Sequence, residues 1–176
     1  MKKNIFKGFH RPIGLPAFLS PMGCLVAYKS FSVERLVRFH DNCAYDLHSD
    51  KQYDWNKLFG FCLDIIGIHK NSIRFGWRYS LSKNRIELCT IIYDNGTPKR
   101  VYIPNHDVPL NCEVDLRIEF DLDSGNRLWI KFLINNKSVY DYCLENVPCL
   151  CYFGCGLYFG GKSRAPHKIS VDIRKM

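Results

Sequence analysis

Apolar and polar residues alternate with a period of two along much of the chain, which is the pattern of β-strands with one buried and one solvent-facing side. The alternation is clearest in the segments 72–79, 114–120, 128–134 and 169–173. In each segment the apolar residues share one face, and we expect that face to point into a core. The inward-facing sets are Ile73, Phe75, Trp77 and Tyr79; Val114, Leu116, Ile118 and Phe120; Leu128, Ile130, Phe132 and Ile134; and Ile169, Val171 and Ile173.

Turn signals separate these runs at short intervals. Asp-Asn-Gly at 94–96 predicts a hairpin between the runs 86–93 and 100–103, because Asn-Gly readily adopts the positive φ angles of a tight turn. Asp-Ser-Gly-Asn at 123–126 and Asn-Asn-Lys at 135–137 predict two further turns. The stretch Lys51–Leu58 alternates poorly and is predicted to be a short helical turn or a loop. Many short strands joined by turns indicate an all-β domain.

Composition supports one strand-rich domain. The 176 residues are 47% apolar and 14% aromatic, which excludes wholesale disorder. Alanine, the best helix former, occurs only four times. Residues 1–23 are interrupted by glycine and proline and are predicted to form an irregular N-terminal arm, with a single β-sandwich over 24–176.

The nine cysteines and the N-terminal segment indicate in which cellular compartment the protein is expected. Nine is an odd number, and several of the cysteines lie inside apolar runs, which favours free thiols in a reducing compartment. Charged and proline residues interrupt the first 24 residues, so no signal peptide is expected, and no run approaches a membrane span. We therefore expect a cytoplasmic protein or a component of a phage particle.

The segment Glu113–Arg174 resembles the distal half of a concanavalin A-like or laminin-G-like jelly roll. The resemblance rests on the hairpin VDLRIEF…NRLWIKFLIN, the return NNKSVYDY, and LYFGG followed by HKISVDI. It implies an antiparallel β-sandwich, and it concerns fold more than function. The motifs DWNKLFGF, HKNSIRFGWR and FGGKSRAPH also resemble small uncharacterised proteins of gut bacteria and their phages. That second resemblance implies no activity.

One carboxylate motif requires consideration as a catalytic site. Glu119, Asp121 and Asp123 share a strand face and resemble the Glu-x-Asp-x-Glu strand of laminarinase-type glycoside hydrolases. In this chain the third carboxylate is aspartate, and it opens a turn. We therefore interpret the motif as an exposed hairpin and keep glycoside hydrolysis as a second alternative.

The predicted binding residues come from three places. Arg74 and Arg78 project from one strand face and could hold carboxylates or phosphates, or pair with Glu87 or Glu119. The glycine-rich basic loop 160–167 can cradle an anion or a sugar hydroxyl, although it is equally explained as a turn. The predicted binding set is Arg74, Arg78, Trp129, Lys162, Arg164 and His167.

Cys149, Cys151, Cys155 and His167 offer four soft ligands, but the spacing of the first two falls short of the usual Cys-x(2–4)-Cys pair. We expect no metal, no cofactor and no catalytic residue.

The net charge of +8 is spread along the chain rather than clustered, so nucleic acid is not the expected partner. The sequence predicts a non-catalytic, carbohydrate-binding or protein-binding recognition module that is not an enzyme. The alternative is a structural or decoration component of a phage virion or another homo- or hetero-oligomeric assembly. No membrane partner is expected.

Overall fold

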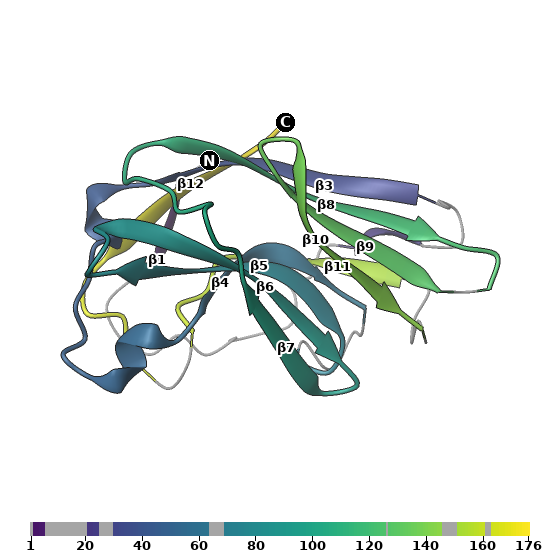
Figure 1. Cartoon of the computed structure of the whole chain (residues 1–176), viewed down its shortest axis with the longest axis horizontal. Helices are drawn as coiled ribbons and strands as arrows, with labels where there is room; N and C mark the ends of the chain where they lie inside the picture. The colour runs from purple at the N-terminus through teal and green to yellow at the C-terminus, as the bar shows by residue number, and fades with distance from the viewer. Residues whose placement is uncertain are drawn as a thin grey trace.

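Two antiparallel sheets of six strands each stack face to face in the computed structural model (Figure 1). The structure describes residues 2–5, 21–24, 30–63, 69–125, 127–145, 151–160 and 163–176. The predicted antiparallel β-sandwich of the jelly-roll kind is confirmed. In the described ranges no helix is long and apolar enough to cross a membrane.

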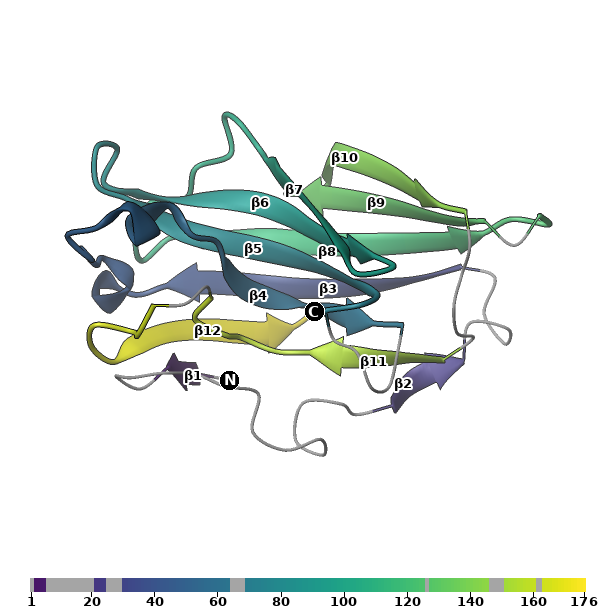
Figure 2. The same ribbon diagram turned by 90° about the horizontal axis from the view of Figure 1, so that it is seen from below.

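Strands far apart in sequence lie side by side in both sheets (Figure 2). The first sheet has the order β1 (Lys2–Ile5), β12 (Ile169–Lys175), β3 (Ser30–Phe39), β8 (Glu113–Leu122), β9 (Leu128–Ile134) and β10 (Lys137–Leu144). The second sheet has the order β2 (Pro21–Cys24), β11 (Cys151–Cys155), β4 (Asn56–Cys62), β5 (Ser72–Ser80), β6 (Arg85–Asp94) and β7 (Thr97–Tyr102). Two short 3-10 turns, η1 (Asp41–Cys43) and η2 (Asp50–Tyr53), follow β3.

Two tight hairpins follow from asparagine and glycine at the turns. Asn95 and Gly96 have φ angles of 48° and 84° and join β6 to β7. Asn135 and Asn136 have φ angles of 49° and 63° and join β9 to β10. Positive φ at both central residues gives the turn the twist of the flanking strands. Both hairpins lie where the turn signals predict them.

The core lies between the sheets and is built from the predicted inward-facing residues. Phe75 and Trp77 of β5 and Phe132 of β9 are fully buried. The rings of Phe75 and Phe132 meet edge to face across the two sheets, with centroids 5.1 Å apart. Because the inward faces fill the core, the outer faces of the two sheets carry the remaining side chains and are where a binding site can form.

The prediction for Lys51–Leu58 is right at its beginning and wrong at its end. η2 covers the start, but β4 begins at Asn56. All seven residues of β4 are buried, because β5 and β11 pair with it on both sides. In the predicted arm 1–23, residues 2–5 form β1 beside β12, and β2, at 21–24, crosses the end of the arm and lies beside β11.

Candidate functional site

Strand register brings three cations onto the outer face of the second sheet. Arg74 of β5 lies opposite Gly60 of β4 on one side and Ile91 of β6 on the other. Ile91 in turn lies opposite Arg100 of β7. Lys57 lies one row further along, opposite a glycine of β5. We call this surface the basic face and define it by Lys57, His69, Arg74, Tyr93, Arg100 and Tyr158.

A lysine–tyrosine pair is fixed at one edge of the basic face. Lys57 and Tyr158 form an antiparallel bridge, in which each backbone N–H donates to the other residue's carbonyl oxygen at 2.9 and 3.0 Å. The Lys57 Nζ lies 5.3 Å from the centroid of the Tyr158 ring. The two side chains come from segments about a hundred positions apart in the chain, and the backbone holds them together before any ligand binds.

Burial and neighbouring cations shift the titration of Lys57. The residue is only 7% exposed. Burial, followed by the charges of Arg74 and Arg100, lowers the pKa of Lys57 to about 8. Lys57 is then a neutral amine in about a tenth of the molecules at pH 7 and in half of them near pH 8. A lysine in this state can accept a proton near neutral pH.

His69 experiences the same surroundings. Burial lowers its pKa, and Arg74, Lys57 and Arg100 lower it further. Its ring lies 5.3 Å from the ring of Tyr93, whose hydroxyl accepts a hydrogen bond from Arg100 at 3.4 Å. The imidazole is therefore neutral near pH 7 and adds no charge to the face.

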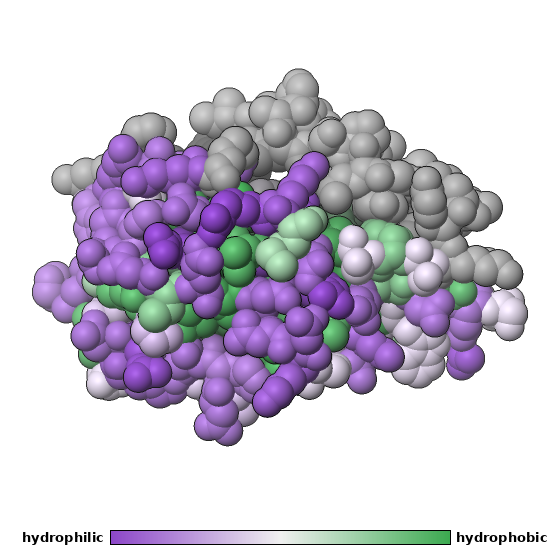
Figure 3. All heavy atoms as spheres, turned by 90° about the horizontal axis from the view of Figure 1, so that it is seen from above, coloured by the Kyte–Doolittle hydropathy of each residue, from purple (hydrophilic) through white to green (hydrophobic). Residues whose placement is uncertain are grey.

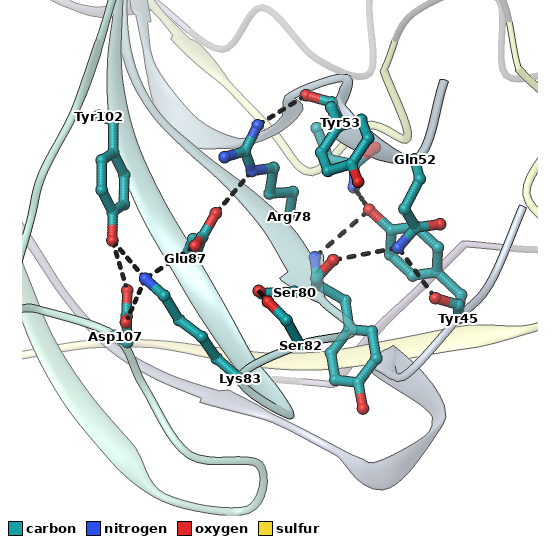
Figure 4. A network of polar contacts seen from close by, with 12 residues as sticks. Tyr45, Gln52, Tyr53, Arg78, Ser80, Ser82, Lys83, Glu87, Tyr102 and Asp107 are labelled. Carbon is teal, nitrogen blue, oxygen red and sulfur yellow. Dashed lines mark hydrogen bonds and ion pairs between the residues drawn. The ribbon is translucent and has the colours of Figure 1, made fainter. Parts of the chain in front are cut away.

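The acidic residue of β6, Glu87, pairs with cations outside the basic face, and the charge of Asp54 partly offsets the cations around Lys57. Glu87 of β6 is 6% exposed and pairs with Arg78 at 2.7 Å and with Lys83 at 2.9 Å (Figure 4). The Lys83 ammonium also donates to Asp107 at 2.9 Å and to the Tyr102 hydroxyl at 2.8 Å. Within the described ranges, no ion pair joins Lys57 or Arg100 to a carboxylate. The basic face therefore carries an excess of positive charge that attracts anions.

Small and apolar residues form the floor of this face. Gly60 and Gly76 lie in the rows of Arg74 and Lys57 and add no side chain above the sheet. Cys89, Ile91 and Tyr93 make a small buried cluster, against which Trp55 packs. Cys89, Ile91 and Tyr93 are buried, as is Arg74 at 2% exposed, so His69 and Arg100 are the exposed members of the face.

The structure does not gather the six predicted binding residues into one site. Arg74 is on the basic face, and Arg78 makes the predicted cross-strand pair with Glu87. Trp129 is on the outer face of the other sheet, opposite Asp121 of β8. His167 contacts the Asn42 carbonyl at 2.9 Å near η1, and Arg164 is exposed in the loop before β12; Lys162 lies outside the described residues.

Lys57, Arg100 and Tyr158 are the residues that sequence reasoning missed. Lys57 stands in the run NKLFGFC, whose other residues are mostly apolar. A lysine in a buried strand is rare, because burying its charge costs free energy. Its position in the sequence could therefore have indicated a functional residue. No such signal marks Tyr158, because its bridge to Lys57 depends on the tertiary fold.

Two other candidate sites lie elsewhere. Glu119 and Asp121 are on the outer face of the first sheet, and Asp123 opens the β8–β9 turn, where its carboxylate accepts N–H groups of Gly125 and Arg127 at 2.9 Å. The third carboxylate is therefore engaged in the turn.

Of the predicted thiol cluster, Cys155 is buried, the side chain of Cys151 is not described, and Cys149 lies outside the described residues. In the described part of the chain, no group of three or more His, Cys, Asp or Glu side chains could hold a metal ion.

The fold is the jelly-roll β-sandwich, built of two antiparallel sheets. No family model matches the chain, and no curated protein matches it in sequence. Among solved structures, alginate lyase Aly36B is similar over 84% of this chain and 68% of its own, at 16% identity and a TM-score of 0.57.

An endo-β-1,4-glucuronan lyase from the fungus Trichoderma reesei matches 98% of this chain and 78% of its own, at 12% identity and a TM-score of 0.53. The carbohydrate recognition domain of Emp46p is similar over 84% of this chain and 70% of its own, at 10% identity and a TM-score of 0.51.

The prediction that this chain is not an enzyme is contradicted by these comparisons, because polysaccharide lyases are prominent among the proteins that share its fold. That prediction rested on the carboxylate motif Glu119, Asp121 and Asp123, whose third member opens a turn. The lysine–tyrosine pair beside arginines does not belong to that motif, and the strand alternation alone did not reveal it. The predicted assembly role, protein partner and location stay predictions.

Proposed function

We propose that the basic face binds an acidic polysaccharide built of uronate sugars and cleaves it by β-elimination. The observation that carries the proposal is the buried Lys57, whose pKa is lowered to about 8, beside Tyr158 and the guanidinium groups of Arg74 and Arg100. A buried cation without a carboxylate partner destabilises a fold, and such residues persist at functional sites. The similarity to alginate and glucuronan lyases supports the same chemistry.

Each group has a role that the reaction requires. A guanidinium paired with the uronate carboxylate neutralises it, which makes the proton on the adjacent ring carbon, C5, more acidic. The neutral amine of Lys57 accepts that proton. The C4–O4 glycosidic bond then breaks, and the Tyr158 hydroxyl donates a proton to the departing O4. The oxygen leaves with the preceding sugar, as the anomeric hydroxyl of its new reducing end. The sugar that lost its C5 proton becomes a new non-reducing end with a C4–C5 double bond.

The residue types replaced in two Aly36B variants also occur on the basic face. Two structures of Aly36B variants, in which a lysine is replaced together with a methionine or a tyrosine, contain an alginate trisaccharide and an alginate tetrasaccharide. Alginate is a uronate polymer, and the same residue types, lysine and tyrosine, meet on the basic face of this chain. Alginate and glucuronan are therefore the first polymers to test.

Replacing Arg100 by alanine is expected to weaken binding of alginate oligosaccharides by about tenfold or more, since a charge-assisted hydrogen bond contributes roughly 1.5–3 kcal/mol. Arg100 is exposed, so the fold should be unaffected. Isothermal titration calorimetry at fixed low salt measures the change.

Lys99→Ala is the matched control for this measurement. Lys99 is the next residue of the same strand, and its ammonium lies over the Tyr142 ring at 4.8 Å instead of on the basic face. The control removes the same unit of charge and should bind nearly as tightly as the wild-type protein. Equal weakening by both substitutions would mean that net charge alone attracts the polymer, and the assignment of the basic face would be wrong.

A further inference from the structure

The outer face of the first sheet has a pocket of its own, away from the basic face. This face is largely hydrophilic, with hydrophobic atoms visible between the polar side chains (Figure 3). The pocket has a volume of about 570 Å³, within the range of small-ligand sites. Its lining includes Ser30, Ser32, Glu119, Asp121, Trp129 and Lys131.

Register explains why these side chains meet. Asp121 of β8 lies between Ser30 of β3 and Trp129 of β9. In the next row on the same face, Glu119 lies between Ser32 and Lys131. Two adjacent rows of three strands therefore present serine hydroxyls, carboxylates, an indole and an ammonium together.

Trp129 is held in place although it is 43% exposed. Its Nε1 donates to Asp123 Oδ2 at 3.3 Å. That carboxylate is itself fixed by the Arg127 guanidinium at 2.7 Å and by the backbone N–H of Gly125. Hydrogen bonds thus orient the indole without burying it, which leaves a fixed aromatic surface at the pocket.

The polar groups of the pocket are available to a ligand. In the part of the chain that the structure describes, neither Asp121 nor Lys131 forms an ion pair with another side chain. Glu119 shares the Arg117 guanidinium with Glu34, at 3.4 Å from Glu119. Two carboxylates beside one ammonium give the pocket a net negative charge, which repels an acidic sugar. The basic face carries the opposite charge.

We propose that this pocket is a second carbohydrate site that takes a neutral pyranose, of the kind found in β-linked glucans. The flat C–H face of such a ring would stack on Trp129. Its equatorial hydroxyl groups would donate to Asp121 and Glu119 and accept from Lys131. The proposal concerns binding and does not depend on cleavage at the basic face.

Laminarihexaose and cellohexaose are the probes, and calorimetry together with tryptophan fluorescence of the full chain is the measurement. The wild-type protein should bind at least one of the two hexasaccharides, and Trp129→Ala should weaken that binding by about tenfold or more. Asp121→Asn should weaken it less, because an amide oxygen still accepts a hydrogen bond. Both residues lie at the surface, and thermal unfolding of each variant reports whether its fold is intact.

Tyr53→Ala is the matched control, since Tyr53 is an aromatic residue 69% exposed that lies outside the pocket. It should bind the hexasaccharide like the wild-type protein. Binding of alginate oligosaccharides should be the same in Trp129→Ala and wild type, so failure of this site and failure of the basic face are distinguishable. Absence of wild-type binding to both hexasaccharides, or full retention of binding by Trp129→Ala, would overturn the proposal.

Discussion

Replacing Lys57 by methionine is expected to lower kcat for polyuronate cleavage by about three orders of magnitude, the usual range for loss of a general base. Methionine fills a similar volume and keeps the apolar packing of the lysine stem, but it cannot accept a proton. Sugar binding should weaken much less than kcat, because Arg74 and Arg100 remain on the face.

The same substitution should make the protein more stable at pH 7. The pKa of Lys57 is about 8 in the folded chain, below the ordinary lysine value of 10.5, so the unfolded chain binds the proton more tightly. The cost of burying the charge is fully present below pH 8 and is relieved as the pH rises from about 8 toward 10.5. Methionine removes that cost, and we expect a gain of about 2 kcal/mol at pH 7, after allowance for residual solvent.

Two measurements check both consequences. In the wild-type protein, kcat/KM should rise with pH up to about 8 and then level off, because this ratio reports the base of the free protein, which must be neutral. Urea unfolding at pH 7 gives the change in the free energy of unfolding. Lys131→Met removes a lysine from the other sheet and should change neither quantity appreciably. A Lys57→Met variant that keeps wild-type kcat, or that is less stable, would contradict the assignment of Lys57 as the base.

Replacing Gly60 by alanine is expected to destabilise the fold by on the order of 3 kcal/mol or more. Gly60 has a φ angle of +156°, and an added Cβ would lie 2.0 Å from the Ile73 carbonyl oxygen and 2.6 Å from the Arg74 Cα. These are backbone atoms of the neighbouring strand and cannot rotate away. The β4–β5 ladder would have to open at the row that carries Arg74, so polyuronate binding should fall as well.

Gly96→Ala is the control for backbone strain without a clash. Gly96 also has a positive φ of +84°, but nothing lies within 4 Å of an added Cβ. Its cost should be about 1 kcal/mol, that of a left-handed conformation alone. Urea unfolding of the two variants gives the comparison. An equal or smaller cost for Gly60→Ala would show that β4 and β5 do not approach as closely as the structure has them.

The fold was predictable because its signals are local. The period-two runs of β5, β8, β9 and β12 gave their buried faces, and Asn-Gly and Asn-Asn gave two hairpins. Ser170 shows where a local pattern fails. Alternation with Ile169 and Val171 places Ser170 on the solvent-facing side, yet it is 2% exposed, because Asn4 of β1 and Asn42 of η1 form hydrogen bonds with it at 3.0 and 2.9 Å. Those contacts depend on chain segments far away in the sequence.

The candidate site was harder to predict for a similar reason. A register shift between Lys57 and Phe59 interrupts the period of two in β4, so alternation does not assign Lys57 to a face. Its lowered pKa arises from burial and from arginines on two other strands. Arg74 was predicted as a binding residue from the alternation of its own strand. Its cationic neighbours depend on the order of the strands in the sheet, and alternation along one strand does not predict that order.

The identity of the cleavage product tests the central claim most directly. Alginate and glucuronan would be incubated separately with the wild-type protein and with Lys57→Met, and the oligosaccharides analysed by ultraviolet absorbance and mass spectrometry. We predict that the wild-type protein yields oligosaccharides with a C4–C5 double bond, which absorb in the ultraviolet and lack the mass of one water relative to hydrolysis products, and that Lys57→Met yields almost none. Products that carry the added water, or no cleavage of either polymer by the wild-type protein, would contradict β-elimination at the basic face.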